Sequence, residues 1–591
     1  MKKYIILSLS LSAFFSLVSC GESFLYKEPQ GSISQSALEN AQGVDLLVTS
    51  TYANFTENGW GATPFNWVFG SVYGGDANKG SDAGDQSVVN EVETYATTTT
   101  NGYVNEKWIW VYKGVQRANI ALKVLNNVQD IDPEVKKSRL GELKFLRSLY
   151  FFEGIKVFGP TSLAWVDETF EDNDPKTYNG TDIWPNVMKD IEEAISNLPE
   201  TQSQVGRANI WAAKSLKAKM FMQQGKMSDA KPILKEILEK GKTSNGLAYG
   251  LEDNMYNNFN TFTDNGKESI FAAQFSMDAR NNSNPGFSLN YPHNVPSDPA
   301  SGKPLAPGGC CGFYQPSYDL VNSYQVDVNG LPYLDNSYRN KPSVSYYDSN
   351  AKKFVNRAEI AVDPRLDFAV GRQGIPYKDW GVCFKDGIGI RDMGNGGIFL
   401  PKKHVYSKKE MEGSLAQKDI YEGWAPGSAL NMQYLSVRDM ILLYAECLAN
   451  DNELAAAMSQ VNKIRARAAF EVNLPKFDNG NYAANYVVKQ YPASHPAFSD
   501  KSVCIEAIRF ERRLELAMEG QRWFDLARWG GEYMSSTVNS YVTYEKQWIT
   551  KFVSASKLTA AKTIFPVPDG QIKDKGNDES GKPYLTQSSV W

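Results

Sequence analysis

Charged side chains recur at helical spacing near the C-terminus, in the segment 505–530. Glu511, Glu515 and Glu519 are four residues apart and therefore share one face of a helix. Four arginines lie within side-chain reach of that face: Arg509, Arg512, Arg513 and Arg522. The carboxylates could perform acid/base catalysis, or they could form a partly buried ion-pair lattice that orients the helix. The lattice is favoured, because paired charges inside proteins usually fix how neighbouring elements align.

Other motifs of enzyme chemistry are scarce in the sequence. The three histidines, His293, His404 and His495, are never four residues apart, so the spacing of a zinc-protease helix is absent. The sequence contains no Gly-x-Ser-x-Gly elbow and no Gly-x-Gly-x-x-Gly fingerprint. The acid pair of a glycosidase meets in space and not along the chain, so a lipid-anchored glycosidase stays open as an alternative.

The segment 58–101 is rich in Gly, Asp, Asn and aromatic residues, which predicts a loop. Alternate residues supply oxygen atoms as a calcium loop does: Asp76, Asn78, Gly80 and Asp82. The bidentate acid that completes such a loop is missing, so solvated turns are favoured over a structural calcium ion, and no other cofactor is expected. Aromatic rings stack on sugar C–H patches while Asp and Asn bond hydroxyls. The candidate ligand contacts here are Trp60, Trp67, Tyr73, Asp76, Asn78 and Tyr95, with core burial as the alternative for the rings.

A second unusual loop, Gly308-Gly309-Cys310-Cys311-Gly312, lies in the region 250–430. Its candidate ligand contacts are Tyr291, Phe313 and Tyr314. Cys310 and Cys311 could form a vicinal disulfide, although their Cα atoms, about 3.8 Å apart, are closer than the usual range of about 4.4 to 6.8 Å. The bonded and free forms both stay open. We predict that 58–101 and 291–314 meet on one face and form a shallow aromatic platform.

Helical periodicity predicts the scaffold that positions these loops. The predicted helical blocks are 111–158, ending at Gly159-Pro160, then 183–240 and 435–469. The last two blocks echo each other, because five residues recur at the same offsets: Ala218, Phe221, Gly225, Ala230 and Leu234 in one, and Ala445, Leu448, Asn452, Ala457 and Val461 in the other. This spacing is typical of tetratricopeptide-like helix hairpins, in which Gly or Asn ends the first helix. A chance hairpin is the alternative.

The N-terminus predicts export and lipidation. Lys2 and Lys3 precede an apolar run, 5–18, which is shorter than the roughly 20 residues of a spanning helix. Leu17-Val18-Ser19 then leads into Cys20, the candidate lipidation site. A lipidated cysteine would tether the mature chain to a membrane without inserting it.

The predicted organisation is a signal peptide (1–19), a tether (20–35) and a single domain (36–591). Within that domain we expect the helical scaffold at 36–245 and 431–530, and an irregular ligand-binding region at 250–430. The net charge of −5 and the lack of any Lys/Arg run argue against nucleic acid as a partner.

The segment 505–530, IEAIRFERRLELAMEGQRWFDLARWG, resembles the C-terminal motif of the SusD/RagB family of outer-membrane nutrient-binding lipoproteins. Further stretches resemble the same family in the same order: Phe24-Leu25 with Lys27-Glu28-Pro29, 108–119 (WIWVYKGVQRAN), 142–159 (ELKFLRSLYFFEGIKVFG), Asp363-Pro364-Arg365, 437–448 (VRDMILLYAECL), 461–468 (VNKIRARA) and Phe565-Pro566-Val567-Pro568. The matching stretches span almost the whole mature chain.

The resemblance implies a mainly α fold, in which four tetratricopeptide-like helix pairs form a superhelical scaffold and a long loop-rich region carries a few short strands. It implies a glycan-binding lipoprotein of the outer membrane, facing the cell exterior, with no catalytic activity. The implied partners are an oligosaccharide and a TonB-dependent transporter of the SusC type, over which the lipoprotein sits as a lid. The RagB branch makes a peptide ligand the alternative.

Overall fold

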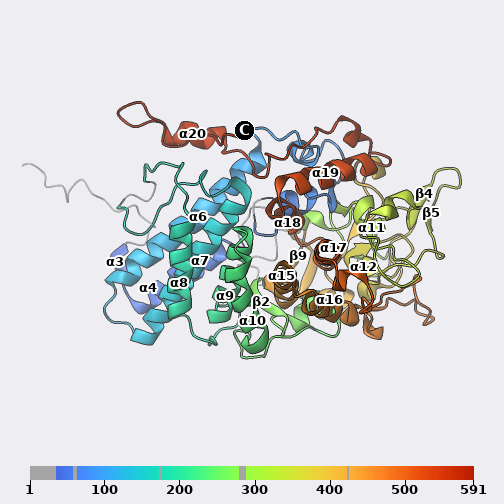
Figure 1. Cartoon of the computed structure of the whole chain (residues 1–591), viewed down its shortest axis with the longest axis horizontal. Helices are drawn as coiled ribbons and strands as arrows, with labels where there is room; N and C mark the ends of the chain where they lie inside the picture. Colours follow the sequence, from blue (N-terminus) through green and yellow to red (C-terminus); the bar gives the residue numbers. More distant parts are fainter. Residues whose placement is uncertain (1–34, 57–60, 62, 172–174, 278–287, 422–424) are drawn as a thin grey trace, which may run out of the picture.

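The computed structural model describes residues 35–56, 61, 63–171, 175–277, 288–421 and 425–591 (Figure 1). The predicted signal peptide, the tether up to residue 34 with its Cys20, and the candidate contact Trp60 lie outside these residues. Among the described residues, no helix combines the length and the apolar character that crossing a membrane requires.

Four antiparallel helix pairs form the scaffold, as predicted. The pairs are α4 (Ala41–Ala53) with α6 (Gly102–Asn127), α7 (Pro133–Phe158) with α8 (Trp184–Asn197), α9 (Ile210–Gln223) with α10 (Met227–Lys240), and α15 (Val437–Asn450) with α16 (Leu454–Ala468). Each pair packs on the next, and α17 (Lys501–Glu515) covers the end of the stack. The tetratricopeptide-like superhelical arrangement is therefore confirmed (Figure 1).

Local sequence explains where the first long helices begin. The side chain of Asn101 accepts hydrogen bonds from the backbone N–H groups of Tyr103 and Val104, which caps α6. Asp132 caps α7 in the same way, and Pro133 occupies the first turn, where no N–H is needed. Every residue of 141–158 in α7 is buried, which makes α7 the central helix of the stack.

The internal echo marks two equivalent hairpins, α9–α10 and α15–α16. Gly225 and Asn452 hold the same place in the two turns and have nearly the same left-handed backbone, with φ of 72° and 64°. Glycine and asparagine are the residues that adopt this conformation most readily at a helix end. Because α10 packs directly against α15, the two hairpins stack as consecutive repeats. The repeat interpretation is confirmed, and the chance hairpin is excluded.

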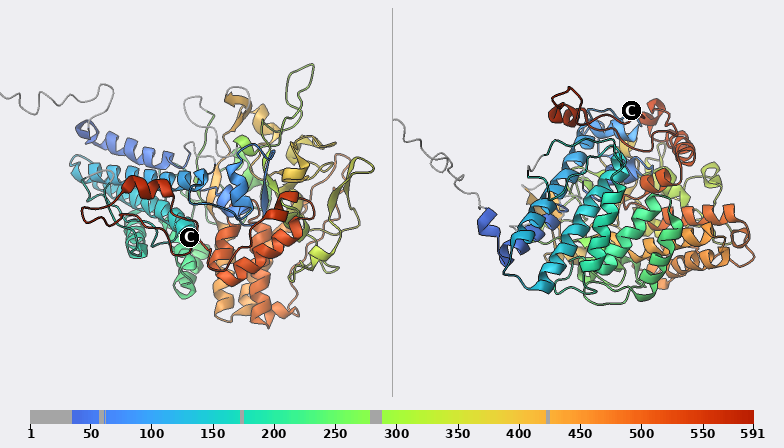
Figure 2. Two further views of the ribbon diagram at one scale, coloured as in Figure 1. Left: turned by 90° about the horizontal axis from the view of Figure 1, so that it is seen from above. Right: turned by 60° about the vertical axis from the view of Figure 1, so that its left-hand side comes forward.

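A long insertion separates those two repeats and carries most of the short strands. Its base is closed by β2 (Ser269–Ala273), which pairs antiparallel with β10 (Met432–Ser436). The other two-stranded sheets are β1 (Ala77–Gly80) with β3 (Phe313–Pro316), β4 (Ser345–Asp348) with β5 (Lys353–Asn356), β6 (Val370–Gly371) with β7 (Leu400–Pro401), and β8 (Ala416–Tyr421) with β9 (Ala425–Ser428). Figure 2 shows the yellow-green part of the insertion at the opposite end from the N-terminal helices.

The charged face of α17 and the turn after it form a buried ion-pair lattice, as the favoured interpretation predicted. Glu511 pairs with Arg365 and Arg465, at 2.7 and 2.9 Å. Glu515 pairs with Arg365 and Arg467, and Glu519 with Lys403 and Arg438. Burial would raise the pKa of Glu515, but the guanidinium groups of Arg467 and Arg365 outweigh burial and hold that pKa at about 2.

The predicted partners of these glutamates were wrong. Arg509 pairs with Glu506, and Arg513 pairs with Asp76 and Asp319. Arg512 binds Asp439, Glu446 and Asp525, and Arg522 lies beyond the end of α17, in the next helix. The lattice therefore joins α17 to the insertion and to α15–α16 and does not stabilise α17 alone. Since Glu511 and Glu515 are buried and ion-paired, they cannot serve as a substrate-facing acid pair.

Candidate functional site

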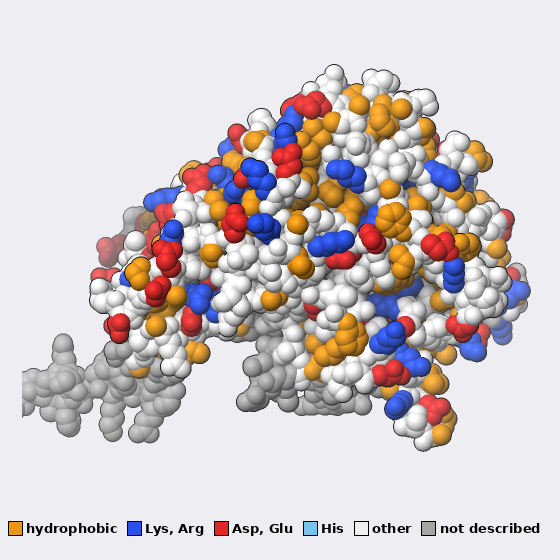
Figure 3. Space-filling view, turned by 90° about the horizontal axis from the view of Figure 1, so that it is seen from below, with side chains coloured by type: hydrophobic (Ala, Val, Ile, Leu, Met, Phe, Trp, Pro, Cys, Tyr) orange, Lys and Arg blue, Asp and Glu red, His pale blue; other side chains and the backbone are white. Residues whose placement is uncertain are grey.

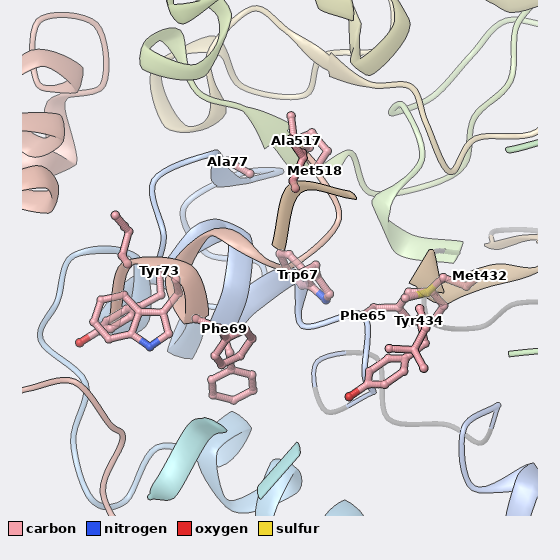
Figure 4. Close-up of a cluster of buried hydrophobic side chains, with 14 of the residues drawn as sticks. Phe65, Trp67, Phe69, Tyr73, Ala77, Met432, Tyr434, Ala517 and Met518 are labelled. Atoms are coloured by element: carbon pink, nitrogen blue, oxygen red, sulfur yellow. The ribbon is translucent and has the colours of Figure 1, made fainter. Parts of the chain in front are cut away.

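The predicted aromatic platform is wrong, because its rings are core residues. None of the described candidate contacts exposes more than 7% of its surface: Trp67, Tyr73, Asp76, Asn78, Tyr95, Tyr291, Phe313 and Tyr314. Figure 4 shows Trp67 and Tyr73 among other buried hydrophobic side chains. Segment Trp67–Val72 forms a π-helix, η1, that inserts these rings beneath α18 (Arg522–Arg528). Burying such large apolar side chains stabilises the fold, because it removes their surface from water.

The two loops do meet, as predicted, and the buried rings join them from inside. Trp67 lies 5.7 Å from Tyr314 between ring centroids, and β1 pairs with β3 so that Gly80 faces Phe313. The N–H of Ser81 donates to the carbonyl of Gly312 at 2.7 Å. The meeting of 58–101 with 291–314 therefore rests on a mixed aromatic core and a short sheet.

Asp76 and Asn78 also face inward. Asp76 pairs with Arg513 at 3.2 Å, and the side-chain amide of Asn78 donates to Glu545 at 3.1 Å. Both side chains are thus occupied by the protein itself, which disfavours the calcium alternative. Within the described ranges, no group of three or more His, Cys, Asp or Glu residues is arranged to hold a metal ion.

An internal ammonium group organises the exposed turn of the first loop. Lys79 is buried, and its Nζ donates to the backbone carbonyls of Asp82 at 2.9 Å and Asp85 at 2.6 Å. Converging carbonyl oxygens are the environment that a cation prefers. The alternating oxygen pattern of this loop suggested a bound metal ion. In the structure, the ammonium group of Lys79 provides that positive charge.

Replacing Lys79 with methionine is expected to loosen the turn 82–85, because two partly buried carbonyls would lose their donor at a cost of about 1 kcal/mol. The amides of Gly84 and Asp85, which donate to the Asp82 carboxylate, report on this turn. Hydrogen exchange at these amides should accelerate by about tenfold. Lys137→Met, on the exposed face of α7, is the matched control and should change nothing there. Unchanged exchange in Lys79→Met would contradict this role.

The exposed surface where the loops meet combines a disulfide with charged side chains. Cys310 and Cys311 form a vicinal disulfide, with Cα atoms 3.7 Å apart, and both residues are half-buried. Beside them, Arg391 pairs with Asp82 and Asp85, each at 2.6 Å. We call Cys310, Cys311, Asp82, Asp85 and Arg391 the loop-junction surface.

Two further cavities lie away from this surface. One, of about 600 Å³, lies between α4 and β2 and is lined by Tyr52, Phe55 and Phe271. The other, of about 460 Å³, lies between α6 and the C-terminal segment and is lined by Trp108 and Tyr112, among others. Both volumes are in the range of ligand pockets. Neither was predicted, because each is lined by three segments that are well separated in sequence.

Hairpins stacked into a superhelix, with a long loop-rich insertion between two of the repeats, define the architecture of this molecule. Residues 267–591 match the model of the SusD family, and residues 33–222 match a model described as starch-binding associating with outer membrane. The chain therefore belongs to the SusD family.

Relatives agree with this assignment over most of the chain. A SusD-like protein of Bacteroides ovatus is 22% identical over 551 residues, which cover 90% of this chain and 83% of the relative. SusD-like protein P38 of Formosa agariphila is 24% identical over 89% of this chain and 92% of its own length.

Solved structures show the same fold at low sequence identity. A SusD-like protein from Bacteroides fragilis superposes with a TM-score of 0.66 at 19% identity, covering 95% of this chain and 99% of that chain. Surface glycan-binding protein A from Bacteroides thetaiotaomicron, solved in complex with laminarihexaose, superposes with a TM-score of 0.61 at 15% identity, covering 93% of this chain and 100% of that chain.

Proposed function

We propose that this protein is a cell-surface lipoprotein that captures oligosaccharides and delivers them to a TonB-dependent outer-membrane transporter. The observation that carries the proposal is membership of the SusD family, through models that together match residues 33–222 and 267–591. A structural neighbour described as a surface glycan-binding protein, solved with laminarihexaose, supports a glycan as the ligand class.

The loop-junction surface suits a hydroxyl-rich ligand. The carboxylates of Asp82 and Asp85 and the guanidinium of Arg391 are accessible acceptors and donors for adjacent hydroxyls. On the face shown in Figure 3, Lys and Arg side chains lie among Asp and Glu side chains and do not gather into one basic patch. This mixture offers no surface for a polyanion on that face, in agreement with the net charge of −5.

Calorimetric titration of the purified protein against a panel of oligosaccharides tests the ligand class, and release of reducing ends from the same panel tests for hydrolysis. We expect binding of at least one oligosaccharide without turnover. Binding of peptides alone would contradict the glycan proposal, and turnover would contradict the assignment as a pure binder.

Co-purification of a TonB-dependent transporter from detergent-solubilised membranes tests delivery, and a lipoprotein that purifies without one would contradict it.

Replacing Cys20 with alanine is expected to release a folded protein from the membrane, because the described helical core begins downstream of the tether. In detergent phase separation, the parent should enter the detergent phase and Cys20→Ala should stay in the aqueous phase. Cys383→Ala, which changes a half-buried cysteine without a disulfide, is the control and should behave as the parent does. A Cys20→Ala protein that still enters the detergent phase would contradict lipidation.

A further inference from the structure

The apolar group that keeps some solvent exposure at the loop junction is a disulfide and not one of the aromatic rings predicted to contact ligand. Every described aromatic residue predicted to contact ligand is buried, whereas Cys310 and Cys311 are only partly buried where the two loops meet. A vicinal disulfide closes a small ring with the peptide bond between its cysteines, so its two sulfur atoms cannot move independently. Sulfur is polarizable and packs well against C–H groups. The pair therefore presents a small, stiff, apolar plate.

Neighbouring backbone fixes this plate from both sides. The N–H of Asn294 donates to the carbonyl of Gly309 at 2.7 Å, and the N–H of Gly309 donates to the carbonyl of Pro292 at 2.8 Å. Beyond the cysteines, the carbonyl of Gly312 accepts from Ser81. The ring of His293 is hydrogen-bonded to the carbonyl of Cys310. A surface fixed in this way binds without first losing conformational entropy.

Charged side chains are hydrogen-bonded to Ser81, the residue that binds the backbone next to the plate. The side chain of Ser81 receives a hydrogen bond from Arg391 at 2.9 Å, and Ser81 is also the residue whose N–H binds Gly312. Burial lowers the pKa of His293 and the carbonyl of Cys310 opposes that change, while Arg391, Asp82 and Asp85 exert smaller effects. The carboxylates therefore lie within electrostatic reach of the residue that holds the plate.

We propose that one sugar ring of an uncharged glycan rests its C–H face on the Cys310–Cys311 disulfide while Asp82 and Asp85 accept hydrogen bonds from its hydroxyls. This inference rests on the glycan-binding function proposed above. The charges of the two carboxylates are already balanced by the guanidinium of Arg391 and the internal ammonium of Lys79, so a uronic acid would find no unpaired positive charge here, whereas neutral hydroxyls can donate to the carboxylates. The surface therefore selects neutral sugars over acidic ones.

The test measures affinity for neutral oligosaccharides and for their uronic-acid counterparts. The parent is compared with a Cys310→Ser/Cys311→Ser double variant, with Asp85→Asn, and with Cys383→Ser as the cysteine control. We expect the double variant to lose about tenfold or more in affinity, equivalent to about 1.4 kcal/mol, at an unchanged melting temperature. Cys383→Ser should bind as the parent does. Asp85→Asn should narrow the preference for neutral over acidic sugars.

The outcomes separate this inference from the proposed function. A parent that binds neutral glycans while the double variant binds equally well would overturn the disulfide plate and leave glycan capture intact. A parent that binds no oligosaccharide would overturn both. If the serine variant does not fold, the parent is treated with a phosphine reductant, and mass spectrometry confirms the two new thiols. Its affinity for the neutral oligosaccharide is then measured at a temperature where the reduced protein remains folded. Undiminished binding by that reduced protein would again overturn the plate.

Discussion

The Glu515→Ala variant is expected to lose about 3 kcal/mol of unfolding free energy, because alanine leaves buried guanidinium groups without their carboxylate. Glu515 is buried and pairs with Arg365, at 3.1 Å, and with Arg467. Chemical denaturation at neutral pH measures the loss. The matched control is Glu506→Ala in the same helix, since Glu506 pairs with Arg509 at a partly exposed site and should cost less than about 1 kcal/mol. Equal losses in the two variants would contradict a buried lattice.

The lowered pKa of Glu515 predicts how the stability difference between the parent and Glu515→Ala depends on pH. The folded-state pKa of Glu515 is held at about 2, below its ordinary value of 4.5. A lowered folded-state pKa contributes stability above the unfolded pKa, and that contribution is lost as the pH falls from about 4.5 towards about 2. The stability gap between the parent and Glu515→Ala should therefore narrow across this acid range. A gap that stays constant would show that charge pairing is not its source.

The Gly70→Ala variant is expected to lose about 3 kcal/mol or more, because a Cβ at Gly70 would lie 1.8 Å from the carbonyl oxygen of Gly520. The π-helix η1 and the turn after α17 are in backbone contact here, so no flexible side chain can move aside. Thermal unfolding measures the effect. Gly102→Ala is the control, since nothing lies within 4 Å of its Cβ at the start of α6, and it should be neutral or stabilising by up to about 1 kcal/mol. A tolerated Gly70→Ala would contradict this close packing.

Helices and turns could be predicted from sequence because their determinants are local. The block predicted at 183–240 contains α8, α9 and α10, and the echo of Gly225 with Asn452 located both hairpin turns. Short strands in the insertion were also expected. Periodicity and turn residues act over a few positions, so tertiary context had little opportunity to override them.

The site could be predicted only in part, because burial and pairing are decided by distant residues. The meeting of the two loops was foreseen, yet Trp67 and Phe313 are the core of that meeting and not its surface. No local pattern links Arg391 to Asp82, which lie more than 300 residues apart. Likewise, Glu511 has helix-spaced arginines nearby but pairs with Arg365 and Arg465, because the insertion and α16 pack on that face.

The stacking of α10 on α15 also determines the order in which this chain can fold. Three residues join the helices within each hairpin, whereas roughly 200 residues separate α10 from α15. Loop closure costs about 0.6 kcal/mol for each doubling of length, so bringing α10 and α15 together costs on the order of 4 kcal/mol more than closing a hairpin. The α9–α10 hairpin can therefore form early, while the docking of α15 must wait until the insertion has collapsed and β2 can pair with β10. A chain stopped between these two events would be an open superhelix, with the surface of α10 exposed to proteases and chaperones.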